Sequence, residues 1–233
     1  MKNTKVSYRN LGLIPYQEAW DLQEKYFAEI LAIKQSNKKQ NENKPTPNYL
    51  LFCEHPHVYT LGKSGNTAHL LLDEAQLKAK DAAFYRINRG GDITYHGPGQ
   101  ITGYPILDLN NFNISIKQYI FGVEEVLIRV LKHYQIEAGR SAGETGVWLD
   151  AEHPQKARKI GAIGARISQM VCMHGFALNV NTDLNYYHSI IPCGIQDKGV
   201  TSLEKELGSK VQMEEVQHLL LQAFSAVFKM SFD

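Results

Sequence analysis

The order of strand-like and helix-like stretches is the feature that most constrains the fold of this chain. Apolar, β-prone runs follow one another in groups, at residues 49–53, 58–61, 84–88, 101–109, 145–149, 159–167 and 171–180. Long stretches with helical spacing of apolar residues occur at only three places, residues 16–35, from Ser115 onward, and 213–228. Grouped strands with few helices between them predict an α+β fold: a mixed β-sheet backed by helices, which we expect on one side of the sheet.

One domain is expected to account for the whole chain, residues 1–233. A chain of 233 residues can bury a good hydrophobic core. Residues 36–48 are rich in Asn, Lys and Gln and contain Pro45 and Pro47. That composition cannot bury apolar surface, so we expect a polar surface loop at about residues 36–48.

Composition excludes several classes of function. The chain has 24 acidic and 25 basic residues, without the basic patch expected of a nucleic-acid-binding protein. No apolar run approaches membrane-spanning length and the N-terminus is polar, so we expect a cytoplasmic protein without membrane contact. Three cysteines without CxxC spacing argue against a disulfide framework. His55 and His57 are the only close histidine pair, so no metal site is expected.

A glycine-rich segment, residues 89–100, is the most unusual stretch of the sequence. It reads RGGDITYHGPGQ, with two pairs of glycines around polar and aromatic residues. Glycine lets the backbone approach a ligand closely, and Arg89, Thr94, Tyr95 and His96 supply hydrogen-bond donors. The residues alone leave two interpretations open, a ligand-binding loop or a tight double turn between strands.

Cys193 is the best placed of the three thiols for nucleophilic chemistry. It stands between Pro192 and Gly194, two residues that break regular structure and can expose a side chain at a sharp turn. The alternative is a small buried apolar residue, which is how most cysteines occur. Cys53 and Cys172 lie inside apolar strand runs, where inert packing is the favoured interpretation.

A catalytic thiol also needs a neighbour that favours its thiolate form. The candidates are His96, His174 and Lys159. Lys159 opens the run KIGAIG, whose small residues would leave space for a partly buried ammonium beside a cleft. The alternative is a solvated lysine at the end of a strand.

Taken together, these segments resemble the lipoyl(octanoyl) transferases, acyltransferases that move an octanoyl group from acyl carrier protein to lipoate-dependent enzyme domains. The resemblance extends over nearly the whole chain and is carried, in the order typical of the family, by residues 54–62, 89–100, 104–109, 146–148, 159–166, 174–180, 192–194 and 200–203. It implies the fold of the biotin and lipoate protein ligases, which is like that of class II synthetases.

The resemblance also implies the roles of individual residues. Cys193 would carry the acyl group as a thioester, and Lys159 would lower the pKa of that thiol. The substrate pocket would be lined by Arg89, Gly90, Gly91, Asp92, Ile93, Thr94, Tyr95, His96, Ala162, Ile163, Gly164, Gly175, Phe176 and Ala177.

The same resemblance implies that the reaction uses no cofactor, neither ATP nor a metal, because the acyl group arrives on the phosphopantetheine of acyl carrier protein. The expected partners are octanoyl-acyl carrier protein and, as acceptors, the lipoyl domains of 2-oxoacid dehydrogenase complexes and the glycine cleavage H protein. We expect a monomer. Carrier proteins of this kind are acidic, so Arg140, Lys156 and Arg158 are either a docking patch or ordinary solvated charges.

The sequence leaves three other functions open. An ATP-dependent lipoate or biotin protein ligase would need a loop that binds an acyl-adenylate and would not need Cys193. A non-catalytic protein that binds acyl ligands would keep the pocket without Cys193 or Lys159. A papain-like hydrolase is disfavoured, because every plausible histidine but His218 precedes Cys193.

Overall fold

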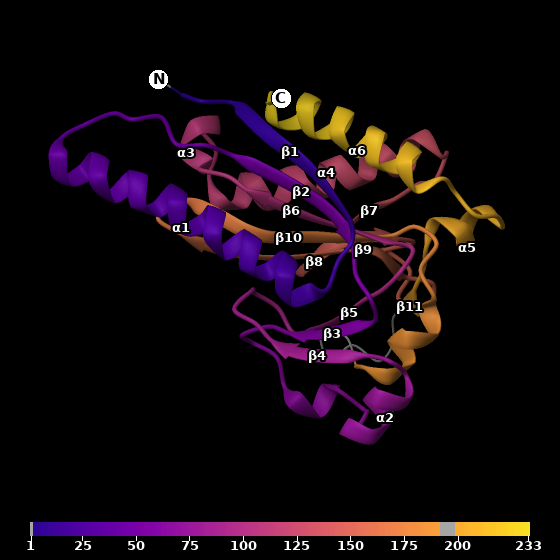
Figure 1. Ribbon diagram of the computed structural model, residues 1–233. Helices are drawn as coiled ribbons and strands as arrows, with labels where there is room; N and C mark the ends of the chain where they lie inside the picture. The colour runs from indigo at the N-terminus through magenta and orange to yellow at the C-terminus, as the bar shows by residue number, and fades with distance from the viewer. Residues whose placement is uncertain (1, 192–198) are drawn as a thin grey trace.

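The computed structural model describes residues 2–191 and 199–233 (Figure 1). The strands within these residues form two sheets. The larger contains β1 (Lys5–Leu13), β2 (Tyr49–Glu54), β6 (Gln100–Ile106), β7 (Gly139–Ser141), β8 (Glu144–Leu149), β9 (Arg158–Ser168), β10 (Val171–Asn179), β11 (Gly199–Val200) and β12 (Ser231–Phe232). Its order is β12-β1-β2-β6-β10-β9-β8-β7, and β11 pairs with β9. Parallel and antiparallel pairs both occur, so the sheet is mixed.

The smaller sheet lies beside the centre of the larger one, at the bottom of Figure 1. It has the order β4-β3-β5 and contains β3 (Val58–Leu61), β4 (Ala83–Arg86) and β5 (Ile93–His96). The short helix α2 (Glu74–Ala79) lies on its outer side, begun by a capping box on Asp73. The glycine-rich segment begins between β4 and β5, so this small sheet holds it against the large sheet.

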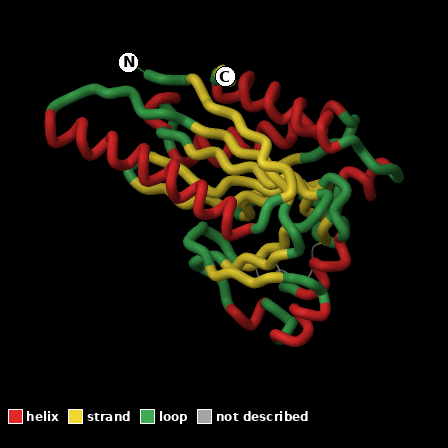
Figure 2. Tube along the Cα trace, viewed as in Figure 1, coloured by secondary structure: helices red, strands yellow, loops and turns green. Residues whose placement is uncertain are grey.

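Helices cover both faces of the large sheet (Figure 2). On one face, α4 (Ile116–His133) and α6 (Met213–Phe228) pack with Leu50 and Phe52 into the main hydrophobic core. On the other face, α1 (Tyr16–Gln40) packs against Leu51 and Cys53 of the same strand. The remaining helices are short: α3 (Leu109–Phe112), α5 (Leu203–Leu207) and 3₁₀ turns at Thr67–His69 and Leu184–Ser189. The mixed sheet backed by helices is confirmed, but the expectation of helices on one side was wrong.

The first helix is longer than its sequence suggested. It continues to Gln40 and ends at Asn41, whose φ of 52° is the left-handed conformation common at helix ends. Residues 36–40 are therefore helical, and the predicted polar loop at 36–48 is confined to residues 41–48. Lysine and glutamine favour helix even when both sides of it face water. Asn37 also exchanges two hydrogen bonds with the backbone of Lys44 and ties the loop to the helix.

Strand β10 departs from simple alternation at one residue. Cys172, Phe176 and Leu178 face the core under α4 and α6, as strand periodicity predicts. His174 has a φ of +59°, and its Nε2 instead donates to Oδ1 of Asn88 at 2.8 Å. Strand alternation alone would place His174 on the face of Cys172 and Phe176, but its backbone leaves the extended region, so the side chain departs from that pattern.

Candidate functional site

A cavity of about 670 Å³ lies over the middle of the large sheet, beside the glycine-rich segment. Its floor is made by small residues on neighbouring strands: Gly164 of β9 is paired with Gly175 of β10, and Ala162 with Ala177. On the next strand, Thr102 is paired with Ala177 and lines the same cavity. Because four adjacent residues of the sheet have at most a methyl side chain, the space above them stays open.

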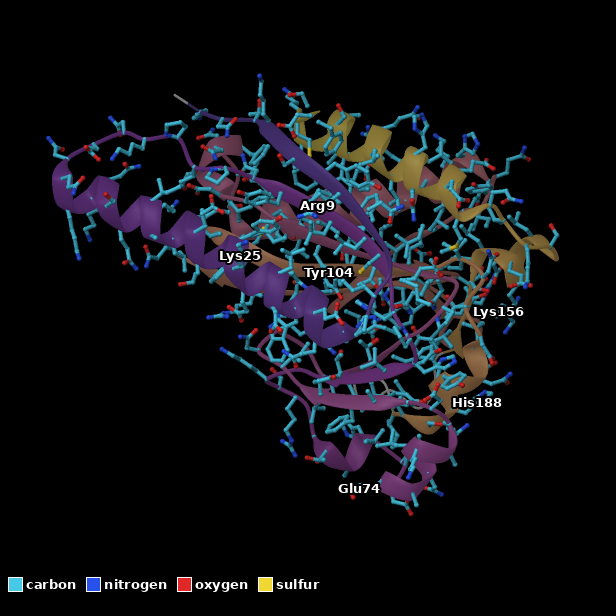
Figure 3. The ribbon with its side chains drawn as sticks, viewed as in Figure 1. Arg9, Lys25, Glu74, Tyr104, Lys156 and His188 are labelled. Carbon is cyan, nitrogen blue, oxygen red and sulfur yellow. The ribbon has the colours of Figure 1, made fainter. Side chains whose placement is uncertain are left out.

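Aromatic and imidazole side chains line another part of the cavity wall. Tyr16, at the start of α1, stacks on His96 with ring centroids 6.0 Å apart and planes 13° apart. Tyr104 follows Thr102 on the same face of β6 and is labelled at the centre of Figure 3. Tyr16, Thr102 and Tyr104 were not predicted as pocket residues, because the packing of α1 and the pairing of distant strands bring them to the site.

The glycine-rich segment forms a wall whose backbone is held at several points. Nη2 of Arg89 donates to both the carbonyl and the hydroxyl of Thr60, at 2.7 and 3.0 Å. The N–H of Gly90 donates to the carbonyl of Ala165 on β9 at 3.0 Å. A Cβ on Gly62 would lie 2.3 Å from the carbonyl oxygen of Gly91, so two backbone segments touch there. The segment is therefore a tightly turned one that also lines the cavity.

The predicted pocket residues lie around this cavity with one exception. Those on its wall are Arg89, Gly90, Gly91, Asp92, Ile93, Thr94, His96, Ala162, Ile163, Gly164, Gly175, Phe176 and Ala177. Tyr95 is fully buried and packs with Tyr59 and Tyr187, and its hydroxyl bonds to His57 at 2.8 Å. In β5, Thr94 and His96 line the cavity whereas Tyr95 packs in the cluster behind it, so the placement of Tyr95 in the pocket was wrong.

Two of the three candidate partners for a thiolate are buried histidines without charge. Burial lowers the pKa of His96 to about 3, and the same cause lowers that of His174 to about 3. His96 Nδ1 donates to Oε1 of Gln100 at 2.8 Å, which sets the tautomer of the neutral ring. Neither ring carries a positive charge near neutral pH, so neither can favour a thiolate by charge.

Lys159 is brought to the cavity wall by an irregularity in the sheet. Val147 is paired with Gly161 but Trp148 with Lys159, so Ile160 is the extra residue of a β-bulge. Ile160 packs in the main core, while Lys159 lines the cavity. Its Nζ donates to the carbonyl of Thr145 at 3.3 Å and lies 4.5 Å from the ring centroid of Trp148. Lys159 is thus a partly buried, positioned ammonium and not a freely solvated one.

Cys193, the predicted nucleophile, lies outside the described residues. Before it, the N–H of Ile191 donates to the carbonyl of His69 at 2.9 Å. After it, Val200 is paired with Lys159 and lines the cavity. The chain therefore returns to the cavity beside the predicted lysine.

The other two thiols are buried in the core. Cys53 and Cys172 are 1% and 0% exposed. Burial raises the pKa of Cys172 to about 12 and that of Cys53 further still. Both thiols therefore stay protonated and shielded, which agrees with inert packing.

Two of the three cations considered for a docking patch are engaged in ion pairs. Arg158 pairs with Glu206 at 2.7 Å, and Arg140 pairs with Glu124 at 3.0 Å. Lys156 is exposed and lies at the edge of the molecule in Figure 3. For the two arginines, the geometry favours a structural role.

The described residues include neither a metal-binding cluster nor a membrane-spanning helix. Within residues 2–191 and 199–233, no group of three His, Cys, Asp or Glu side chains could hold a metal ion. None of the helices in those same ranges is both long and apolar enough to span a bilayer.

Solved structures with the same fold are lipoate protein ligases. A bi-partite lipoate protein ligase from Thermoplasma acidophilum has a TM-score of 0.70 at 17% identity, covering 100% of this chain and 86% of that chain. A lipoate-protein ligase A bound with ATP has a TM-score of 0.66 at 14% identity, covering 99% of this chain and 87% of that chain. At such identities the likeness shows the fold alone, and it confirms the predicted fold.

Sequence relatives are much more similar. Proteins named octanoyltransferase from Christiangramia forsetii and Flavobacterium johnsoniae are 57% and 56% identical to this chain, covering 97% of it and 97% and 98% of their own lengths. One from Cytophaga hutchinsonii is 51% identical, covering 99% of this chain and 96% of its own. The family model described as the lipoyl protein ligase A/B catalytic domain matches residues 15–225. With its fold, its glycine-floored cavity and these relatives, the chain belongs to the lipoyl protein ligase A/B catalytic domain family.

Proposed function

We propose that this chain is an octanoyltransferase that works through a thioester on Cys193. It moves an octanoyl or lipoyl group from acyl carrier protein to a specific lysine of lipoate-dependent enzyme domains, the first step of protein lipoylation. The observation that carries the proposal is the 57% identity to an octanoyltransferase over 97% of both chains. The cavity beside Lys159 supports it independently, because its small-residue floor leaves room for an acyl chain.

In the first step, the thiolate of Cys193 attacks the carbonyl carbon of the thioester on the carrier's phosphopantetheine. The new C–S bond forms at Cys193, and the carrier thiol leaves and takes up a proton. One thioester replaces another, so no ATP is required. The ammonium of Lys159 favours the attacking thiolate, a role that the neutral rings of His96 and His174 cannot perform. Backbone N–H groups near Gly164 or Gly194 are candidates to hold the developing oxyanion.

In the second step, the amine of the acceptor lysine attacks the thioester on Cys193. An amide C–N bond forms, the C–S bond breaks, and the thiol of Cys193 is regenerated. The attacking amine must be neutral, so a base has to remove a proton from it. The candidate base is Lys159 in its neutral form, after its ammonium has given a proton to the departing carrier thiolate, or a water that Lys159 holds. Amide formation is favourable and draws the whole reaction forward.

The acyl chain lies over the floor of glycine and alanine residues. Each methylene that leaves water contributes about 0.8 kcal/mol, so the depth of the cavity selects chain length. Tyr16 and Tyr104 are candidates to close the cavity, because their bulky rings line it together with His96. The octanoyl preference follows from a cavity of fixed size and not from a polar contact.

The reaction takes place with partners that the enzyme meets in the cytoplasm. The donor is octanoyl-acyl carrier protein, and the acceptors are the lipoyl domains of 2-oxoacid dehydrogenase complexes and the glycine cleavage H protein. No ATP, metal or other cofactor takes part. The enzyme acts as a single catalytic domain and as a monomer.

One experiment tests the thioester. The full chain is mixed with octanoyl-carrier protein without ATP, and mass spectrometry locates any hydroxylamine-labile octanoyl adduct. We expect the adduct on Cys193, its loss in Cys193→Ser, and its retention in the matched control Cys172→Ala, whose thiol is buried in the core. A wild-type enzyme without the adduct would refute the proposal. Octanoylation of the acceptor only from free octanoate and ATP would identify a ligase instead.

The role of Lys159 is tested on the thiol itself. In Lys159→Ala the fold should persist, because the side chain lines a cavity, while alkylation of Cys193 near neutral pH should slow. The rate is measured with iodoacetamide from pH 5 to 10. An alkylation profile equal to that of wild type would remove Lys159 from its assigned role.

A further inference from the structure

Glu124 is a buried carboxylate that the mechanism above does not use. It lies on α4 beside Val123, Val126 and Leu127, which are all completely buried. A carboxylate in such surroundings is costly unless both of its oxygens have partners. Arg140 Nε donates to Oε2 at 3.0 Å, and the backbone N–H of Gly146 donates to Oε1 at 3.0 Å. The second of these bonds leads to the cavity.

A single peptide unit connects Glu124 to Lys159. The N–H of Gly146 and the C=O of Thr145 belong to the same planar group and, in the trans form, point to opposite sides of the chain. The N–H donates to Glu124, and the C=O accepts from Nζ of Lys159 at 3.3 Å. The orientation of this one plane therefore determines where one acceptor for the lysine ammonium lies.

The backbone at this point would not hold that orientation by itself. Gly146 has a φ of +129°, a conformation that only glycine adopts readily. A Cβ there would lie 2.7 Å from the carbonyl oxygen of Gly161 and 3.3 Å from Cε of Lys159, so a larger residue does not fit. Glycine satisfies both demands but restrains the adjoining peptide plane less than other residues do. The bond to Glu124 adds a restraint on that plane.

The ion pair with Arg140 does not explain why a carboxylate is buried at position 124. Its Nη2 also donates to Oε2 of Glu125 and to the carbonyl of Phe121, both at 3.1 Å. Its guanidinium carbon lies 3.6 Å from the ring centroid of Phe121. Phe121 and Glu125, both on α4, therefore hold Arg140 even without Glu124. The contribution that is specific to Glu124 is its hydrogen bond with the N–H of Gly146.

We propose that Glu124 is a positioning residue for Lys159, acting through the Thr145–Gly146 peptide. By accepting from the N–H, the carboxylate orients the unit and polarises its carbonyl, which strengthens the bond to the lysine ammonium. This inference rests on the proposed function, because it assigns Glu124 to the same catalytic lysine. The buried negative charge of Glu124 thus helps to place the positive charge of Lys159, which lies 35 positions further along the chain.

The test compares α4 variants by the pH profile of Cys193 alkylation, measured in the full chain beside Lys159→Ala. Glu124→Leu should reproduce at least half of the shift that Lys159→Ala causes. It should also slow acylation by octanoyl-carrier protein about 10- to 100-fold, since a misplacement of about 1 Å can cost about 100-fold. Glu124→Gln retains an oxygen acceptor for the Gly146 N–H and should keep most of the wild-type profile.

Two controls separate positioning from stability. Glu125→Gln alters a contact of Arg140 that does not reach Gly146, and Val126→Ala weakens the core from the same helix. Both should leave the alkylation profile unchanged even if they lower the melting temperature. Hydrogen exchange at the Gly146 amide should be faster in Glu124→Leu and unchanged in Val126→Ala.

The outcomes are distinct. A wild-type alkylation profile in Glu124→Leu, or an equal shift in Val126→Ala, would overturn the positioning role and leave the thioester proposal intact. A wild-type enzyme without a hydroxylamine-labile adduct would instead overturn the proposed function. If Glu124→Leu does not fold, Glu124→Ala takes its place as the variant without an acceptor: a wild-type profile in it overturns the positioning role, and a shift towards the profile of Lys159→Ala supports the role.

Discussion

Replacing Ala162 with leucine should shorten the acyl chain that the enzyme prefers. Ala162 stands in the floor row formed with Ala177 and Thr102, so a larger side chain there projects into the cavity and not into the packed core. Leucine adds three carbon atoms and displaces about three methylenes of substrate. At about 0.8 kcal/mol each, the loss is about 2.4 kcal/mol. This corresponds to about a 50-fold fall in kcat/KM for the octanoyl donor, since about 1.4 kcal/mol is tenfold.

The assay measures kcat/KM for acyl-carrier protein donors with chains of different lengths. Donors short enough to avoid the new side chain should keep wild-type rates, so the preferred length should fall by about three carbons. Ala75→Leu, an equal change at an exposed position of α2, controls for general effects of leucine. The reasoning is refuted if Ala162→Leu lowers the rates for short and long donors by the same factor, because a shorter cavity cannot do that.

Two further predictions concern stability. Gly103→Ala should lower the free energy of unfolding by about 1–3 kcal/mol in urea titrations, because the new Cβ would lie 2.2 Å from the ring of Phe176, whereas Gly139→Ala, with nothing within 4 Å, should not be destabilising. Burial lowers the pKa of His55 to about 4 and those of His96 and His174 to about 3. Below about pH 6.5 the unfolded chain binds protons that the folded chain excludes, so stability should fall as the pH drops from about 6.5 to about 4, by up to about 1.4 kcal/mol per pH unit for each histidine. Equal urea midpoints at pH 7.5 and pH 5 would contradict the buried, neutral state of these rings.

Elements with a strong local pattern could be predicted from the sequence. Helix α6 has the bounds predicted, 213–228, and α4 begins at the capping box of Ser115 and Gln118. β4 and β6 end at Arg86 and Ile106, two and three residues earlier than expected, because apolar residues continue into the turns that follow. Strand periodicity also could not reveal the positive φ of His174, since no glycine or proline marks that position. Local patterns thus predicted the elements better than their ends.

The site shows where such local patterns stop being informative. The glycine-rich segment is noticeable in sequence, yet the cavity floor depends on Gly164 facing Gly175 across two strands, a register that no single stretch contains. In the same way, the pattern of α4 marks a core-facing helix, and a charged residue there would look like an exception to it. A role for Glu124 can be inferred only from the structure, in which the sheet places Gly146 and Lys159 next to it. A buried charge on an apolar helix face is therefore best regarded as a question about its partners, and here the partners lead to the predicted catalytic lysine.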